Sequence, residues 1–286
     1  MNIQDIVGQA STLFVLPDSV VRLKACMDDE ASSIDDIADI ISFDPSLAAQ
    51  ILRVANSALY RFPNEIDTIS KAIKVIGTRA TYDLALAYGV SHVFSEMDGK
   101  VIDLDKFWEQ SVSCGLLAKY FADERNEREP ERLFVAGLLH NIGELVIAAL
   151  MPEKAKRIQE FNARVSPAEL QLGVLGFTVN RLSAAIIKQW GIPASIYRPI
   201  AAIHNTEAVH LGIKSEHVDN TILQLSYVLA LDNVNQDIYP SYNNLKPHLH
   251  ENLHLNRDDL ENALDITNLQ CISVVSIFNP NAFMPY

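Results

Sequence analysis

Apolar residues recur along this chain at the spacing of α-helices. Isoleucines stand at positions 34, 37, 40 and 41 after Ser33, which places them on one side of a helix. A second apolar stripe, at 47, 51, 54 and 55, follows Asp44-Pro45, and a third, at 69, 73 and 76, runs from Thr68 to Gly77. Ser, Asp and Thr are favoured N-cap residues, Pro suits a first helical turn, and Gly ends helices with a positive φ. The pattern therefore predicts consecutive short helices.

The helical pattern continues to the C-terminus, and no alternating pattern typical of a sheet appears. Residues 232–252, rich in Asn, Pro and Tyr, are predicted to form a long loop. The predicted fold is all-α, with an N-terminal helical bundle over 1–98, a second helical bundle over 99–231, and a C-terminal loop and extra helices over 232–286. The later helices are expected at 105–122, 131–150, 152–165, 167–175, 178–190, 193–203, 217–231 and 257–266, followed by an apolar segment at 269–278.

Composition and charge restrict the class of protein. The 286 residues are 49% hydrophobic and 21% charged, typical of a globular chain that can bury a large core. The net charge of −13 disfavours nucleic acids and anionic membranes as partners. The chain has neither about 18 uninterrupted apolar residues, as a transmembrane helix needs, nor a basic segment like that of a secretory signal. With three widely spaced cysteines expected as free thiols, the sequence predicts a cytoplasmic protein.

Four separated segments carry a family resemblance. They are DPSLAAQILRVANSALY at 44–60, ISKAIKVIG at 69–77, AGLLHNIGELVI at 136–147, and KQWGIP at 188–193 followed by His204. Their order and spacing, across roughly residues 10–230, resemble the HDOD family, which is related to HD-type metal-dependent phosphohydrolases. The resemblance implies that the second bundle is HD-like and that the protein serves bacterial signal transduction.

The family-signature residues in the first segments also have a physical interpretation. Asp44 and Pro45 begin a helix, and Gly77 ends one. Asn56 and Ser57 can bond to backbone groups of the following turn, because short polar side chains compete well for local partners. A role for Asn56 in binding a partner is the alternative interpretation.

The HD-like segments depart from the metal-binding pattern of HD-type hydrolases. Those enzymes hold divalent metal with a His, a His-Asp pair and a later Asp. In this chain, Gln110 stands at the first His position, and His140 is followed by Asn141 in place of Asp. Val179 stands where many relatives have another His, and Tyr227 stands at the terminal Asp. Because both carboxylates are replaced, the resemblance implies a degenerate site with no metal and no cofactor.

Two uses remain open for the histidines that survive. His140 is either a core residue bonded within its helix or part of a ligand pocket. The candidate pocket combines His140 and Asn141 with Gln110, His204 and Asn205.

A separate histidine cluster, His248, His250 and His254, could bind zinc. Histidines in a surface loop without a structural task are the simpler interpretation.

Three functions are consistent with these features. The first is a non-catalytic signalling or scaffold module that binds a protein or small-molecule partner through a cleft between the bundles. The alternative is an HD-type metal-dependent phosphohydrolase or cyclic-dinucleotide phosphodiesterase. The third is a small-molecule sensor whose pocket is the degenerate site around His140 and His204. The sequence leaves the oligomeric state open.

Overall fold

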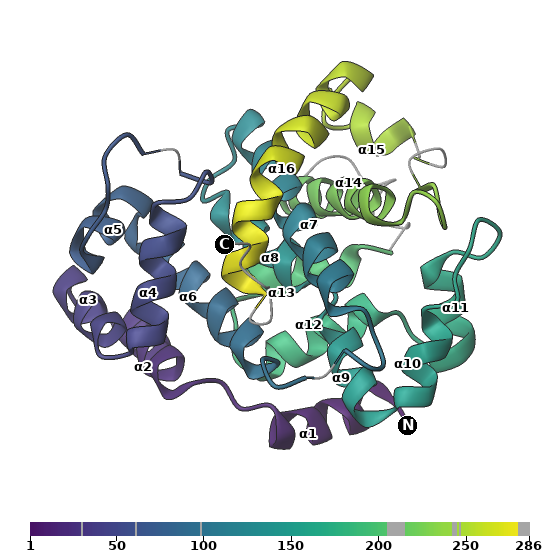
Figure 1. The fold of residues 1–286 in the computed structure, drawn as a ribbon, viewed down its shortest axis with the longest axis horizontal. Helices are drawn as coiled ribbons and strands as arrows, with labels where there is room; N and C mark the ends of the chain where they lie inside the picture. The colour runs from purple at the N-terminus through teal and green to yellow at the C-terminus, as the bar shows by residue number, and fades with distance from the viewer. Residues whose placement is uncertain are drawn as a thin grey trace. The chain divides into compact units, whose positions relative to one another are not determined.

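The computed structural model describes residues 1–29, 31–60, 62–97, 99–204, 215–241, 245 and 247–279. These residues form sixteen α-helices (Figure 1). Among them, the only β-type pairing is an isolated bridge between Asn162 and Val165. The predicted all-α class is confirmed.

The chain divides into two compact units. Unit 1 contains Met1–Leu13 and Met97–Leu269, and unit 2 contains Phe14–Glu96 and Gln270–Tyr286. The change near residue 97 lies close to the boundary expected at 98. The division differs from the expected one at both ends of the chain. The first helix groups with unit 1, where it packs on α12, and the C-terminal region is shared between the units instead of standing apart.

Unit 2 contains five complete helices and the last part of α16, and several of the helix limits follow local sequence signals. Ser33 accepts a hydrogen bond from Asp36 N–H in a capping box, and Thr68 accepts one from Lys71 N–H. Ile37 and Ile41 are buried as expected, whereas Ile34, the first residue of that stripe, is exposed. Its helices are α2 (Asp18–Asp28), α3 (Ile34–Ser42), α4 (Pro45–Ala55), α5 (Ile69–Ile76) and α6 (Thr78–Val93).

Unit 1 holds the larger set of helices. Within it, α7 packs on both α8 and α14, and α12 packs on α9 and α13. The elements are α1 (Ile3–Leu13), α7 (Leu104–Glu124), α8 (Glu131–Leu139), α9 (Ile142–Leu150), α10 (Pro152–Ile158), α11 (Pro167–Leu175), α12 (Val179–Gln189), α13 (Ala194–Ala202), α14 (Ser215–Asn235), α15 (Pro247–Glu251) and the first part of α16 (Arg257–Phe278).

Two glycines let α7 and α8 approach closely. A Cβ at Gly137 would lie 2.6 Å from the Cα of Gly115, and a Cβ at Gly115 would lie 2.7 Å from the carbonyl oxygen of Phe134. Side chains cannot occupy such short distances, so both positions require glycine. This contact fixes the helix that leads to His140.

Several predicted limits are wrong. The helix expected over 131–150 is interrupted at His140 and Asn141, where Asn141 leaves helical geometry (φ −115°, ψ 10°). The helix expected over 152–165 ends at Ile158, and an Asn162 turn follows. The loop expected over 232–252 contains the end of α14 and all of α15. The last two C-terminal segments form one continuous helix, α16.

One segment of unit 1 is long and apolar enough to cross a membrane. Within residues 131–150, an 18-residue window has a mean hydropathy of 1.9, and 83% of that window is buried inside the protein. Among the described residues, a second candidate exists only if α11 and α12, which are bent by 71°, are taken as one broken span. Core helices have the same composition as membrane spans, and here the packing of α8 and α9 accounts for the hydropathy.

Candidate functional site

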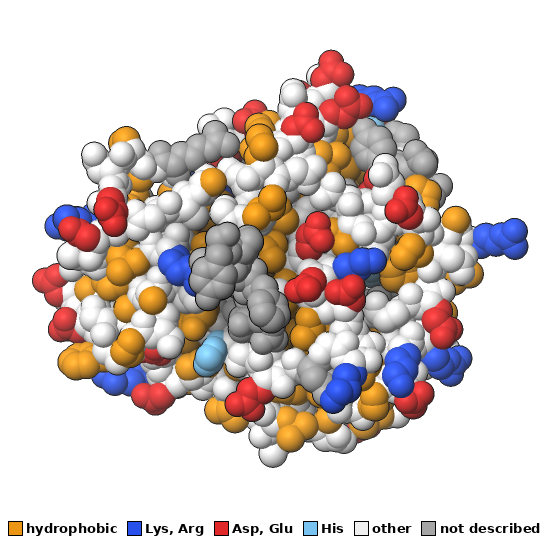
Figure 2. Space-filling view, viewed as in Figure 1, with side chains coloured by type: hydrophobic (Ala, Val, Ile, Leu, Met, Phe, Trp, Pro, Cys, Tyr) orange, Lys and Arg blue, Asp and Glu red, His pale blue; other side chains and the backbone are white. Residues whose placement is uncertain are grey.

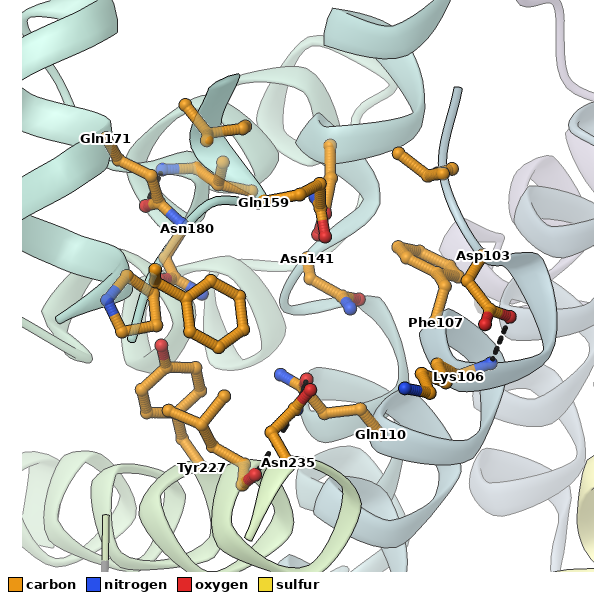
Figure 3. A pocket seen from close by; sticks show the side chains of 17 residues that line it. Asp103, Lys106, Phe107, Gln110, Asn141, Gln159, Gln171, Asn180, Tyr227 and Asn235 are labelled. Carbon is orange, nitrogen blue, oxygen red and sulfur yellow. Dashed lines mark hydrogen bonds between the residues drawn. The ribbon is translucent and has the colours of Figure 1, made fainter. Parts of the chain in front are cut away.

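The candidate site is a pocket inside unit 1, with a cavity volume of about 90 Å³. Four of the positions at which the resemblance placed lost metal ligands line it: Gln110, Asn141, Val179 and Tyr227 (Figure 3). They come from α7, from the residue before α9, from the first residue of α12, and from α14. The fold thus gathers around one cavity residues that are more than a hundred positions apart.

The start of α9 is held by contacts from other helices. Asn141 is the N-cap residue but makes no side-chain capping bond. Instead, its Oδ1 accepts a hydrogen bond of 2.9 Å from Ser111 Oγ on α7. The N–H of Gly143 donates to Ser183 Oγ on α12, at 2.9 Å. A Cβ at Gly143 would lie 2.9 Å from the carbonyl oxygen of Val179, so glycine also permits this close approach.

The start of α12 is held in a similar way. Its N-cap residue, Thr178, makes no side-chain capping bond. The N–H of Val179 donates to Gln171 Oε1 at 2.9 Å, so a glutamine from α11 takes over the capping role. Asn180 Nδ2 donates to the carbonyl oxygen of His140 at 3.0 Å, which ties α12 to the break between α8 and α9.

Two further polar pairs line the pocket. Asn235 Nδ2 donates to Gln110 Oε1 at 3.4 Å and to the carbonyl oxygen of Leu231 at 3.3 Å. Gln159 Nε2 donates to Glu144 Oε1. Figure 3 shows Gln110, Gln159 and Asn235 around the same space as Asn141 and Tyr227.

The two surviving histidines contact Tyr227 and are not among the residues that line the pocket. The ring centroid of His140 lies 5.5 Å from that of Tyr227, and the ring centroid of His204 lies 5.2 Å from it, both edge to face. His140 is fully buried, and its Nδ1 donates to the carbonyl oxygen of Gly137 at 2.5 Å. Within the described part of the chain, neither Nε2 has a hydrogen-bond partner. Asn205, the last member of the predicted pocket, lies outside the described residues.

Burial disfavours the charged forms of the ionisable side chains in this region. It lowers the pKa of His140 to about 4 and the pKa of His204 to about 4, so both imidazoles are neutral at pH 7. Burial raises the pKa of Glu144 to about 7, against the opposing effect of the Gln159 hydrogen bond. Burial, with the charge of Glu144 as a smaller cause, raises the pKa of the Tyr227 phenol, which stays protonated.

Comparison with known proteins identifies the family. The family model of the HDOD domain matches residues 13–206, which is more than half of the chain. The chain belongs to the HDOD family.

HDOD relatives are distant in sequence. An uncharacterized protein of Treponema pallidum (strain Nichols) is 25% identical over 193 residues, and the match covers 66% of this chain but only 37% of that protein. The chain therefore spans well under half of the length of this relative.

Solved structures share the HDOD fold. A candidate signal transduction protein of Marinobacter aquaeolei VT8 aligns with a TM-score of 0.71 at 21% identity, over 95% of this chain and 61% of that one. A candidate phosphohydrolase of Shewanella amazonensis SB2B gives 0.71 at 20% identity, over 97% and 98%. An HDOD domain protein of unknown function from Geobacter sulfurreducens gives 0.67 at 18%, over 96% of each chain. At these identities, the similarity establishes the fold.

Divalent metal, which the related hydrolases use, does not fit this HDOD site. Val179 offers no ligand atom, and the phenol of Tyr227 is neutral where an anionic ligand would be needed. Asn141 carries no charge, and its Oδ1 is engaged by Ser111. In the described part of the chain, no group of three or more His, Cys, Asp or Glu side chains could hold a metal ion.

The HDOD signature residues in unit 2 make local structural bonds. Asn56 Nδ2 donates to the carbonyl oxygens of Leu52 and Ile66, and the N–H of Ile66 donates to Asn56 Oδ1, each at 2.8 Å. Ser57 Oγ donates to the carbonyl oxygen of Val54 at 2.7 Å. These contacts favour the structural interpretation of Asn56.

The other two signature sites begin and end helices, and Asp44 also accepts a hydrogen bond from Ser19 Oγ of α2 at 2.6 Å. Asp44 accepts hydrogen bonds from the N–H groups of Ser46 and Leu47 at the start of α4, whose first residue is Pro45. Gly77 ends α5 with φ +93°, a conformation that other residues rarely adopt.

The histidines near α15 include one with a structural bond. His250 Nδ1 donates to the carbonyl oxygen of Leu255 at 3.0 Å, and His254 adopts a positive φ of 55° after α15. The side chain of His248 lies outside what the structure describes. The possible zinc cluster stays a prediction without further support.

The sequence analysis missed most of the pocket's polar residues. Glu144 lies one helical turn after Asn141, so helical spacing could have indicated it. Gln159, Gln171, Asn180 and Asn235 come from four other places in the chain. They carry no local motif, and only tertiary packing brings them together.

Proposed function

We propose that this HDOD protein is a non-catalytic signalling module in which a small-ligand pocket occupies the place of the hydrolase metal centre. The observation that carries the proposal is the lining of the pocket. Four positions related to metal ligands converge there, and they present two amides, an aliphatic side chain and a neutral phenol. Such a set can bind a ligand by hydrogen bonds but cannot compensate the charge of two metal ions.

The proposed partners are a small molecule in this pocket and a protein that responds to its occupancy. Charge also supports this choice over nucleic acid. On the face drawn in Figure 2, Asp and Glu side chains lie among the Lys and Arg side chains, without the continuous basic surface that phosphate backbones require. The interaction cleft expected between two bundles stays a prediction.

Hydrolysis assays test the absence of catalysis. We expect no turnover of p-nitrophenyl phosphate or bis-p-nitrophenyl phosphate above background with Mg²⁺, Mn²⁺, Fe²⁺ or Ni²⁺. The Asn141→Asp variant should also be inactive, because Gln110 and Tyr227 remain. Metal-dependent turnover by the unmodified protein that disappears in His140→Ala would overturn the proposal. Turnover that persists in His140→Ala, measured on the same preparation scale, identifies a contaminating hydrolase.

A further inference from the structure

We infer that the pocket binds a small, uncharged, planar group of the amide type, such as an amide, a urea or the edge of a pyrimidine, and discriminates against phosphate. This inference rests on the proposed function and names the ligand class of the same site. Its basis is the way in which the amide side chains around the cavity, here called the amide pocket, are held.

The amides of the pocket are anchored at one end. Gln159 Nε2 donates to Glu144, and no other residue of the described structure bonds Gln159 Oε1. Gln110 Oε1 accepts from Asn235 Nδ2, which leaves the Gln110 NH₂ group and the Asn235 oxygen on the side of the cavity. Each anchored amide therefore offers a donor or an acceptor whose position is already fixed.

Asn141 is the most buried of these donors. It is 6% exposed, its Oδ1 faces Ser111, and its Nδ2 has no hydrogen bond within the described residues. Nδ2 is not enclosed by protein, because the residue lines the cavity. A buried amide with one end bonded and the other directed into a cavity is a site where a ligand acceptor gains a hydrogen bond.

The shape and size of the cavity favour a planar group. Phe107, Phe161 and Tyr227 line it and can cover the faces of a flat ligand. The cavity volume of about 90 Å³ is several times what one water molecule needs. The pocket therefore has room for a small group such as an amide or the edge of one ring.

The charges around the pocket disfavour anions. Of the residues that line it, Lys106 is the one basic side chain, and the oppositely charged Asp103 stands beside it at the exposed end. Glu144 is a second acid, and the phenol of Tyr227 stays protonated and uncharged. A phosphate would lose its hydration without a buried cation to replace it, whereas an uncharged amide would exchange its hydrogen bonds with water for hydrogen bonds with the protein.

Calorimetric titration of the full chain, without added metal, tests the inference with uracil, orotate and inorganic phosphate. Uracil presents amide-type edges, and orotate is the same ring with a carboxylate. We expect uracil to bind at millimolar concentration or below, orotate to bind at least about tenfold more weakly, and phosphate to give no heat. A tenfold change corresponds to about 1.4 kcal/mol, which the uncompensated desolvation of the orotate carboxylate exceeds.

Matched variants locate the binding. Asn235→Leu and Gln159→Leu should each weaken uracil binding about tenfold or more. Gln159 is exposed, so its variant keeps the test valid if Asn235→Leu fails to fold. Asn233→Leu is the control, because Asn233 lies on the same helix and is exposed outside the pocket. Its uracil affinity should equal that of the unmodified protein.

Three results would overturn the inference: no uracil binding at millimolar concentration, tighter binding of orotate or phosphate than of uracil, or uracil binding unchanged in both pocket variants. These results concern the ligand class alone. The proposed non-catalytic function is overturned separately, by metal-dependent hydrolysis.

Discussion

Helices of unit 2 and helices around the amide pocket of unit 1 begin in different ways. In unit 2, α3, α4 and α5 start at Ser33, Asp44 and Thr68, and each side chain caps its own helix. Beside the pocket, α9 and α12 start without such a bond, and residues distant in sequence hold them. Local capping bonds thus begin α3, α4 and α5, whereas tertiary polar contacts hold the starts of α9 and α12. The other two helices that begin beside the pocket, α7 and α11, keep capping bonds of their own, from Asp103 and Ser166. Departures from local rules are expected where a site is built.

The largest expected difference between the units comes from glycines at helix contacts. In unit 1, Gly137→Ala would place a Cβ 2.6 Å from backbone atoms of Gly115, which cannot move independently of α7. We expect a loss of about 3 kcal/mol or more in the free energy of unfolding. In unit 2, Gly89→Ala would place its Cβ 2.5 Å from a methyl group of Val20. A side chain can adjust, so about 1 kcal/mol is expected.

Urea unfolding followed by tryptophan fluorescence measures the first change selectively, because both tryptophans, Trp108 and Trp190, belong to unit 1. Circular dichroism follows both units. Gly173→Ala serves as a control, since a Cβ there meets nothing within 4 Å. Equal effects of Gly137→Ala and Gly89→Ala would contradict the packing argument.

The second prediction concerns acid pH, at which two histidines and one glutamate of unit 1 have opposite effects on the free energy of unfolding. The pKa of His140 and of His204 is lowered to about 4, so the unfolded chain takes up protons before the folded one as pH falls below about 6.5. Between pH 7 and 5, each histidine should cost about 2 kcal/mol of stability. Glu144, with its pKa raised to about 7, binds its proton more readily in the folded state and opposes this loss.

Glu144→Gln therefore sharpens the acid response. The variant lacks the opposing contribution, so it should lose more stability between pH 7 and 5 than the unmodified protein, by about 1–2 kcal/mol. The other ionisable residues that line the pocket are Asp103, Lys106 and Tyr227. Urea midpoints from tryptophan fluorescence at the two pH values give the comparison. A variant that loses less stability than the parent would reverse the assigned sign.

Prediction from the sequence was most accurate where local residues mark the ends of helices. The caps at Ser33, Asp44 and Thr68, and the end at Gly77, are local signals that the structure bears out. The break at His140 and Asn141 was missed because residues 136–147 are mostly apolar and contain no Pro, and because neither residue at the break is a Gly. It depends on Ser111 and Asn180, which contact the break from two other helices.

The pocket was predictable only in part, for the same reason. Alignment by resemblance named Gln110, Asn141, Val179 and Tyr227, and the fold brings these together. The resemblance did not identify Gln159 or Asn235. Polar residues are common in exposed segments, and no local sequence signal distinguishes an amide in a pocket from one in solvent. The replacement of the metal ligands could be predicted from the sequence, but the amide side chains around them could be identified only from the structure.

The third prediction tests a local polar contact in unit 2. Asn56→Ala removes the partners of the Ile66 N–H and carbonyl groups, and Ile66 is only 4% exposed. We expect a loss of about 1–3 kcal/mol, measured as a lower urea midpoint by circular dichroism. A variant that unfolds like the parent but loses a protein partner would favour the binding role of Asn56 instead.

The smallest expected effects compare the N-caps themselves. Ser33→Ala removes a capping box, so α3 should lose about 1 kcal/mol, as is usual when Ser is replaced at an N-cap. Thr178→Val removes a hydroxyl that caps nothing at α12 and has no hydrogen-bond partner within the described residues. Because Gln171 bonds the first N–H of α12, this variant should stay within about 0.5 kcal/mol of the parent. Circular dichroism should detect the first change, and tryptophan fluorescence should show almost none for the second. A larger loss from Thr178→Val than from Ser33→Ala would mean that α12, too, depends on its own cap, and the difference between the two regions would disappear.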